Sequence, residues 1–195
     1  NDWNSFQTML DNGNDVQSHT TNHVDYGDTI RWPNGPDSTE VDSVYRLSVV
    51  DINTNLKGAR CLTIAYPFGW ADHEIADKYF IGGRGVAGLI NRANNINYRG
   101  TFSGFANNIP PVDALLNPKV LINGKSFYRE WLCMHYHGMD GGEEKYFSHL
   151  AQKKDSIWVT WFRNVILFGQ ERDSHTLTMR GVSDSKISFD LTDLM

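Results

Sequence analysis

Long apolar runs are absent from the chain, and this excludes a membrane-spanning helix. The longest uninterrupted stretches, such as VILF at 165–168, are a few residues long, whereas a helix needs about 20 apolar residues to cross a bilayer. Basic runs are absent too, and the formal net charge of −5 is spread along the sequence. We therefore expect neither nucleic acid nor a membrane surface as a partner.

Cysteine is scarce, because the chain contains only Cys61 and Cys133, each within an apolar, strand-like run. Two such residues can pair in an oxidising compartment or stay buried as free thiols, so they do not identify the compartment. Repeats, low-complexity tracts and linker-like segments are also absent. The 195 residues suffice for one domain with its own hydrophobic core.

Hydrophobic spacing predicts helices that alternate with short strands. Helical patterns are found at 2–13, 37–56, 71–79, 141–155 and 163–173. Strand patterns are found at 15–18, 59–69, 80–83, 127–138 and 156–162, with a hairpin at 175–193. In the second helix, Ser38 or Thr39 is the expected N-cap. This alternation favours an α/β fold with a largely parallel sheet, either open or closed into a barrel.

Polar or turn-forming clusters follow three of the predicted strands. They are SHTTNH at 18–23, AYPFGW at 65–70 and MHYHGMD at 134–140. Functional side chains of α/β folds gather where parallel strands end. The three clusters are therefore expected to lie close together.

The first cluster places His19 and His23 four residues apart. Neutral imidazole is a common zinc ligand, and the two rings can converge if the backbone turns helically between them. The alternative is a pair of solvated loop histidines, and seven histidines in the chain make a chance pair unsurprising. Spacing alone leaves both interpretations open.

The other two clusters contain candidates for acid–base and oxyanion chemistry. His135 and His137 are two apart, so they share a face if the strand continues between them. One of them can act as a general acid or base, or both can be hydrogen-bonded structural histidines. The AYPFG turn offers a backbone N–H that can stabilise an oxyanion, or it is an ordinary turn.

Together, these clusters resemble the polysaccharide deacetylase family, carbohydrate esterase family 4. The stretch GNDVQSHTTNH at 13–23 is similar to the family's histidine motif, AYPFG at 65–69 to its turn motif, and WLCMHYHG at 131–138 to its late histidine motif. The resemblance covers residues 1–175, and the order of the motifs is more specific than any one of them.

The resemblance implies a role for each motif residue. His19 and His23 match ligands of a divalent metal, expected to be Zn²⁺, with Co²⁺ or Ni²⁺ as alternatives. Such an ion polarises an acetyl carbonyl and activates water. His137 matches the general acid, with His135 as the second choice. The backbone N–H of Phe68 matches the oxyanion donor.

Other parts of the family pattern are missing from this sequence. The motif that supplies the base and a metal-binding Asp would precede the histidine motif, and no Asp-Asp pair occurs in the chain. Asp15 matches a structural acid of the histidine motif. Ala65 stands where the family has an Arg, and Arg84 is a candidate replacement. The Asp-Trp motif has only a faint counterpart in Asn97 and Tyr98.

The resemblance implies a distorted (β/α) barrel of the polysaccharide deacetylase type that lacks its first strand. Residues 1–175 form the incomplete catalytic domain and 176–195 a truncated C-terminal β extension. We expect a fragment of a longer enzyme, with a divergent homologue as the alternative. A sheet edge left open by a missing strand favours self-association.

The expected activity is metal-dependent hydrolysis of N- or O-acetyl groups from a polysaccharide or oligosaccharide. The expected partner is an acetylated glycan, and the resemblance implies an extracellular or cell-envelope location. One alternative is a non-catalytic carbohydrate-binding domain on a deacetylase scaffold. Another is an α/β domain in which the histidines are structural.

Overall fold

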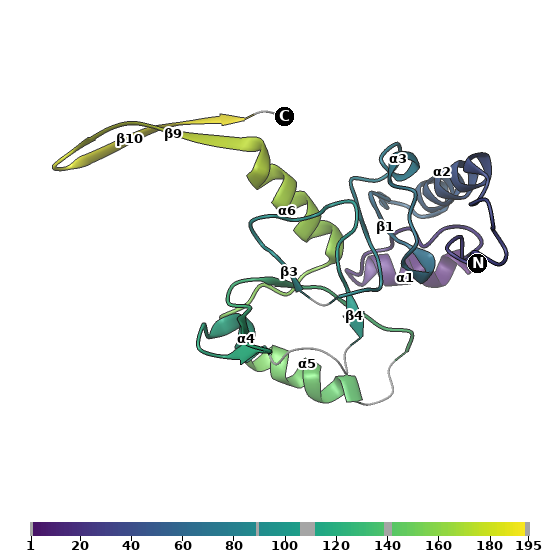
Figure 1. Ribbon diagram of the computed structural model, residues 1–195, viewed down its shortest axis with the longest axis horizontal. Helices are drawn as coiled ribbons and strands as arrows, with labels where there is room; N and C mark the ends of the chain where they lie inside the picture. Colours follow the sequence, from purple (N-terminus) through teal and green to yellow (C-terminus); the bar gives the residue numbers. More distant parts are fainter. Residues whose placement is uncertain (1, 89, 106–111, 139–141, 194–195) are drawn as a thin grey trace.

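The computed structural model describes residues 2–88, 90–105, 112–138 and 142–193, and Figure 1 shows their course. Helices and short strands alternate in the first part of the chain. In order, these elements are α1 (Trp3–Asp11), α2 (Ser38–Asn55), β1 (Thr63–Ala65), the 3-10 turn η1 (Pro67–Gly69), α3 (His73–Ala76) and β2 (Gly82–Arg84).

Several even shorter strands follow, together with three further helices. In order, these elements are β3 (Ile90–Asn91), β4 (Gly104–Phe105), α4 (Asp113–Leu116), β5 (Leu121–Ile122), β6 (Lys125–Ser126), β7 (Trp131–Leu132), β8 (Met134–His135), α5 (Gly142–Gln152) and α6 (Phe162–Ser174). A loop predicted at 107–111 lies outside the described residues.

The chain order of these elements confirms the predicted helices, but the cap of α2 lies one residue earlier than predicted. The Thr39 N–H donates to the Asp37 carboxylate at 2.8 Å, so Asp37 is the N-cap in place of Ser38 or Thr39. A carboxylate at this position also favours the positive end of the helix dipole. At the end of α1, Gly13 adopts a φ of +83° that suits glycine.

Parallel pairs and single parallel bridges join five segments in chain order, while the intervening strands β3, β5, β6 and β7 pair antiparallel as β3–β7 and β5–β6. Ser18 bridges Ile64 of β1, and β1 pairs with β2. Arg84 at the end of β2 bridges Thr101, and β4 then pairs with β8. The pairings follow sequence order, as they do in parallel α/β sheets. The barrel itself stays a prediction.

Two predicted strands differ from the structure. Residues 15–18 contribute only the single bridge at Ser18. Residues 157–161 form no strand, and α6 begins at Phe162. The apolar residues Trp158 and Val159 are exposed there. This strand prediction was wrong, because a run of apolar and β-branched residues becomes a strand only beside a pairing partner.

The main core lies between α2 and the first parallel strands. Val41, Val44, Tyr45 and Ile52 face inward from α2 at helical spacing and are buried, as is Ile64 of β1. Cys61 and Cys133 are both buried free thiols. Within the described residues, no helix is long and apolar enough to cross a membrane.

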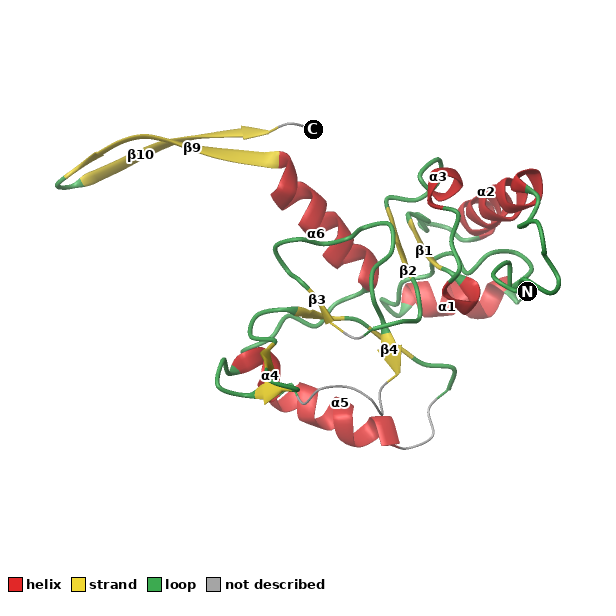
Figure 2. Cartoon of the chain, in the orientation of Figure 1, coloured by secondary structure: helices red, strands yellow, loops and turns green. Residues whose placement is uncertain are grey.

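The C-terminal segment forms the predicted hairpin. β9 (His175–Ser183) and β10 (Lys186–Asp193) pair antiparallel with a register shift next to Ser188 and Phe189. Figure 2 shows this hairpin continuing from the end of α6 and extending away from the other strands and helices. Its strands are therefore paired only with each other within the described residues.

Candidate functional site

The SHTTNH loop is anchored to the core through buried hydroxyl groups. The Ser48 hydroxyl donates to the Tyr45 carbonyl at 2.8 Å, and the hydroxyls of Ser18 and Ser48 lie 2.7 Å apart. Since the proton of Ser48 is used in the first bond, Ser18 is the donor in the second. The Ser18 oxygen in turn accepts the Thr20 N–H at 3.2 Å. The serine before the first histidine thus joins the loop to α2.

His19 is oriented by the strand that follows it in the sheet. Its Nδ1 lies 2.6 Å from the carbonyl oxygen of Ala65, the last residue of β1. Because a carbonyl only accepts hydrogen bonds, Nδ1 carries the proton and Nε2 is left as an electron-pair donor. Histidines that bind metal through one ring nitrogen are commonly oriented by a carbonyl that accepts a hydrogen bond from the other ring nitrogen.

The rings of His19 and His23 meet through an irregular loop. Their centroids lie 4.6 Å apart with an edge-to-face angle of 78°. Thr20 and His23 both have positive φ values, 63° and 51°, and the His23 N–H donates to the Thr20 hydroxyl at 3.1 Å. Left-handed residues held by a side-chain hydrogen bond therefore produce the convergence, rather than a helical turn.

The PFG turn lies directly beside this pair. The rings of His23 and Phe68 are 5.1 Å apart, and the Phe68 side chain is 57% exposed. Phe68 has a φ of 56° and precedes Gly69, with a φ of 83°. No hydrogen bond is formed by the Phe68 N–H within the described residues. Thr20, His23 and Phe68 are three of the five non-glycine residues with positive φ in the described part of the chain, and such strain gathers at functional sites.

The third cluster joins the site through a serine. The Ser103 hydroxyl donates to the Gly85 carbonyl at 2.6 Å, and its oxygen lies 2.9 Å from Nδ1 of His135. Since the Ser103 proton is used, the His135 ring donates from Nδ1. His135 and Ser103 are both buried, whereas His137 is exposed, because β8 ends at His135. The two rings are 6.2 Å apart.

Arg84 lies at the centre of these connections. It is the last residue of β2 and is paired with Ala65, whose carbonyl binds His19. Its guanidinium donates to the Gly85 carbonyl at 3.3 Å, the same oxygen that Ser103 binds. Burial lowers the pKa of the Arg84 guanidinium. Arg84 thus links the first histidine cluster to the last.

The site is electropositive. The pKa of His19 is lowered first by burial and then by the charges of His23, Arg84 and His137, against the opposing effect of its bond to Ala65. The pKa of His135 is also lowered, by burial first and then by Arg84 and His137.

His19 and His23 fit two positions of a metal site, with imidazole nitrogens of the kind that zinc binds. Among the described residues, no three His, Cys, Asp or Glu side chains gather closely enough to hold an ion. Asp15 is occupied elsewhere, because it pairs with Arg163 at 3.1 Å and accepts from Gln17 at 3.0 Å. Among the described residues, His19 and His23 are therefore the two side chains that the predicted metal site would use.

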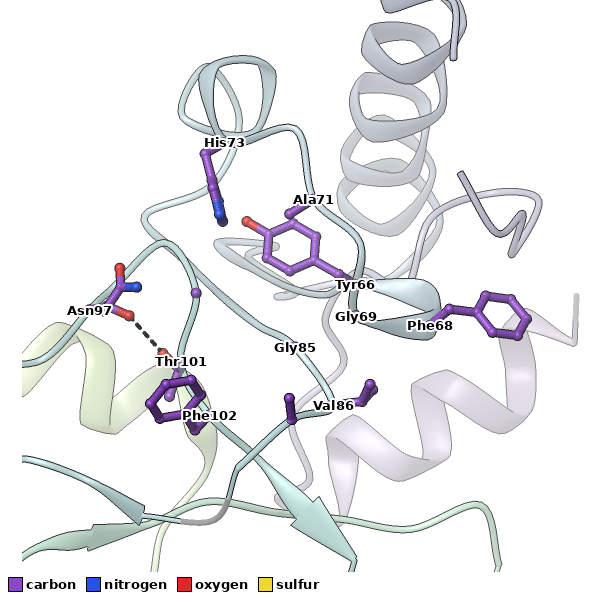
Figure 3. A pocket seen from close by; sticks show the side chains of 12 residues that line it. Tyr66, Phe68, Gly69, Ala71, His73, Gly85, Val86, Asn97, Thr101 and Phe102 are labelled. Atoms are coloured by element: carbon purple, nitrogen blue, oxygen red, sulfur yellow. Dashed lines mark hydrogen bonds between the residues drawn. The ribbon is translucent and has the colours of Figure 1, made fainter. Parts of the chain in front are cut away.

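A cavity of about 290 Å³ adjoins the site. In Figure 3, Tyr66 and His73 lie on one side of it and Thr101 and Phe102 on another. The rings of Tyr66 and His73 meet edge to face at 5.9 Å. Its volume is at the lower end of small-molecule pockets. The full lining is Tyr66, Phe68, Gly69, Ala71, His73, Gly85, Val86, Ala87, Asn97, Gly100, Thr101 and Phe102.

Sequence reasoning missed Ser103 and most of this cavity. Ser103 lies in a segment without a recognisable motif, and its role depends on Gly85 and His135, which are distant in sequence. Asn97, a faint motif counterpart, lines the cavity. Tyr98 instead donates to Asp173 at 2.6 Å, in α6.

Comparison with known proteins found a similarity to part of a gellan lyase. A gellan lyase from Bacillus sp. is 32% identical over an alignment of 224 positions, which includes all of this chain and 9% of that protein. The chain thus spans only a small part of the length of the relative it matches. No protein-family model matches the chain, and no solved structure matches it.

Proposed function

We propose that this domain acts on a glycan and removes acetyl groups by metal-dependent hydrolysis. One observation carries the proposal: the rings of His19 and His23 converge, and the His23 ring contacts the ring of Phe68, whose backbone N–H forms no hydrogen bond within the described residues. A ligand pair next to an oxyanion donor is the arrangement that such a reaction needs. The similarity to a protein named for a polysaccharide supports a glycan as the substrate.

In this proposal, each predicted site residue has a defined role. His19 and His23 hold the divalent ion, which when bound supplies Lewis-acid polarisation and an activated water. The Phe68 N–H donates to the oxyanion of the tetrahedral intermediate. His137, exposed beside the buried His135, gives a proton to the leaving sugar nitrogen or oxygen. The polysaccharide deacetylase barrel and a location outside the cell belong to the same proposal.

Metal retention and acetate release in histidine variants test this proposal. The zinc-loaded chain is desalted and analysed for zinc per chain, and acetate is measured after incubation with acetylated chitooligosaccharides and acetylated xylan. Loss of a group that only hydrogen-bonds to a metal ligand weakens metal binding about 10–100-fold, and loss of the ligand itself should cost more. We therefore expect His19→Ala and His23→Ala each to weaken zinc retention at least tenfold and to abolish acetate release.

His149→Ala is the matched control, because His149 lies on α5 and faces Asp113 at 3.8 Å. It should keep both zinc and activity. Full zinc retention and full acetate release in both site variants would contradict the proposed metal pair.

A second candidate is a carbohydrate-binding domain without catalysis. The observation that favours it is the cavity beside the histidines, where the Phe68 and Phe102 rings are more than half exposed. Aromatic faces of this kind suit the apolar face of a sugar ring. Saturable glycan binding by a zinc-loaded chain that releases no acetate from any acetylated glycan would favour this candidate.

A further inference from the structure

The C-terminal hairpin has one apolar face and one polar face. The register of β9 and β10 pairs the apolar residues with one another, and the bulge keeps the three pairs on one side. These side chains are each between 57% and 68% exposed: Leu177, Met179, Val182, Ile187, Phe189 and Leu191. The other side carries hydroxyl groups and the ion pair of Arg180 with Asp190. The three apolar pairs therefore form one contiguous, uncharged face.

An uncovered apolar face of this size is unusual. Six side chains exposed to this degree present roughly 600–800 Å² of apolar surface, whereas the largest apolar patch of a typical monomer is about 300–600 Å². A two-stranded hairpin is also only marginally stable by itself and gains stability from a second layer. In Figure 1, the hairpin extends from the end of α6 and away from the other described elements, so none of them supplies that layer.

The apolar face suits a second copy of itself. Its three pairs contain no charged side chain, so two copies can meet without opposing like charges. The area is close to the about 800 Å² that each partner contributes to an interface of standard size. Because the hairpin projects from the rest of the chain (Figure 2), two hairpins can stack while the remaining elements lie at opposite ends of the pair.

We propose that two copies of this chain form a twofold dimer in which the apolar faces of their hairpins pack against each other. The central Met179 and Phe189 of each copy then meet their own counterparts. The pair nearest α6 in one copy covers the pair nearest the turn in the other. Two sheet layers packed about 10 Å apart exclude water from such side chains. This contact uses side chains, whereas pairing at an open sheet edge uses backbone groups.

The mass of the full chain in solution tests this dimer. The chain is first treated with a chelator, because His19 and His23 of two copies could otherwise share a metal ion. Sedimentation equilibrium is then measured from about 5 to about 500 μM, a range that suits an interface at the lower end of the standard size. We expect the mass to rise with concentration from 22.2 kDa toward twice that value.

A charge placed on the apolar face should weaken the dimer. Met179→Lys should raise the dissociation constant at least about tenfold, because the twofold axis brings the two ammonium groups together in an apolar layer. In a single copy, Met179 is 68% exposed, so the new side chain stays hydrated there. Thr178→Lys is the matched control. It adds the same charge on the opposite face, across from Asp190, and should keep the dimer.

Cross-linking locates the contact on the hairpin. Under mild oxidation, Met179→Cys should form a disulfide between two copies, whereas Thr178→Cys, on the polar face, should not. The native Cys61 and Cys133 are buried and do not compete.

A mass that stays at 22.2 kDa over the whole concentration range would overturn the inference, and this measurement needs no variant. Dimerisation that persists unchanged in Met179→Lys would assign the contact to another surface and overturn it as well. Equal cross-linking of the two cysteine variants would have the same consequence. Acetate release is measured separately, so the dimer and the proposed hydrolysis can fail independently.

Discussion

The region around α2 and the C-terminal hairpin contain similar apolar residues, which are buried in the first region and exposed in the second. In the first region, Ile64 and Val41 are fully buried. In the hairpin, the register pairs apolar residues across the strands: Leu177 with Leu191, Met179 with Phe189, and Val182 with Ile187. All six of these side chains are more than half exposed.

The register shift of the hairpin keeps its apolar residues on one face. Alternation alone would place Val182 opposite to Met179, because the two are three residues apart. The bulge beside Ser188 and Phe189 absorbs one residue and restores the common face. The hairpin is thus amphipathic, yet within the described residues no other element packs on that face. Apolar patterning predicts a strand, whereas stabilisation by burial requires a second layer.

The largest expected difference between the two regions is the effect of truncating a core side chain. Ile64→Ala truncates a buried side chain of β1 in the main core and should lower the free energy of unfolding by about 2–5 kcal/mol. Urea unfolding followed by circular dichroism measures it. A loss below about 1 kcal/mol would show that the α2 region is not the main core.

Glycine substitutions extend the comparison to the backbone. A Cβ at Gly83 of β2 would overlap the Tyr66 ring, whereas a Cβ at Gly181 of β9 meets no atom within 4 Å. Gly83→Ala should therefore destabilise the chain by about 1–3 kcal/mol through overpacking. Gly181→Ala should change stability by less than about 0.5 kcal/mol. Similar midpoints of urea unfolding for the two variants would break the distinction.

The smallest expected effect is that of a polar substitution in the hairpin. Phe189→Thr keeps a residue that favours strands, and Phe189 is already 57% exposed. The variant should lose only the cross-strand contact with Met179, which is worth about 0.2–1 kcal/mol. Thermal unfolding at a concentration where the chain is monomeric measures the change. A loss as large as that of Ile64→Ala would mean that the hairpin face is covered within a single chain.

The candidate site divides in the same way into predictable and unpredictable parts. Residue spacing and motif order single out His19, His23, Phe68 and His137; the structure places the rings of His19, His23 and Phe68 side by side, and the roles of all four stay predictions. Spacing could not reveal Ser103, because a single serine in an irregular segment has no pattern. The predicted strand at 156–162 failed for the same reason, because pairing partners are not encoded locally.

The sequence by itself determined that α1, α2, α3, α5 and α6 are helices, to within a few residues at each end, whereas α4 was not predicted. Periodicity, capping residues and turn residues act over a few neighbours, so these features can be read along the chain. Only the tertiary structure decided that His19 donates to Ala65 and that the half-buried Arg84 donates to the Gly85 carbonyl. Those features depend on contacts between residues far apart in sequence, where packing and desolvation are established only when the sheet assembles.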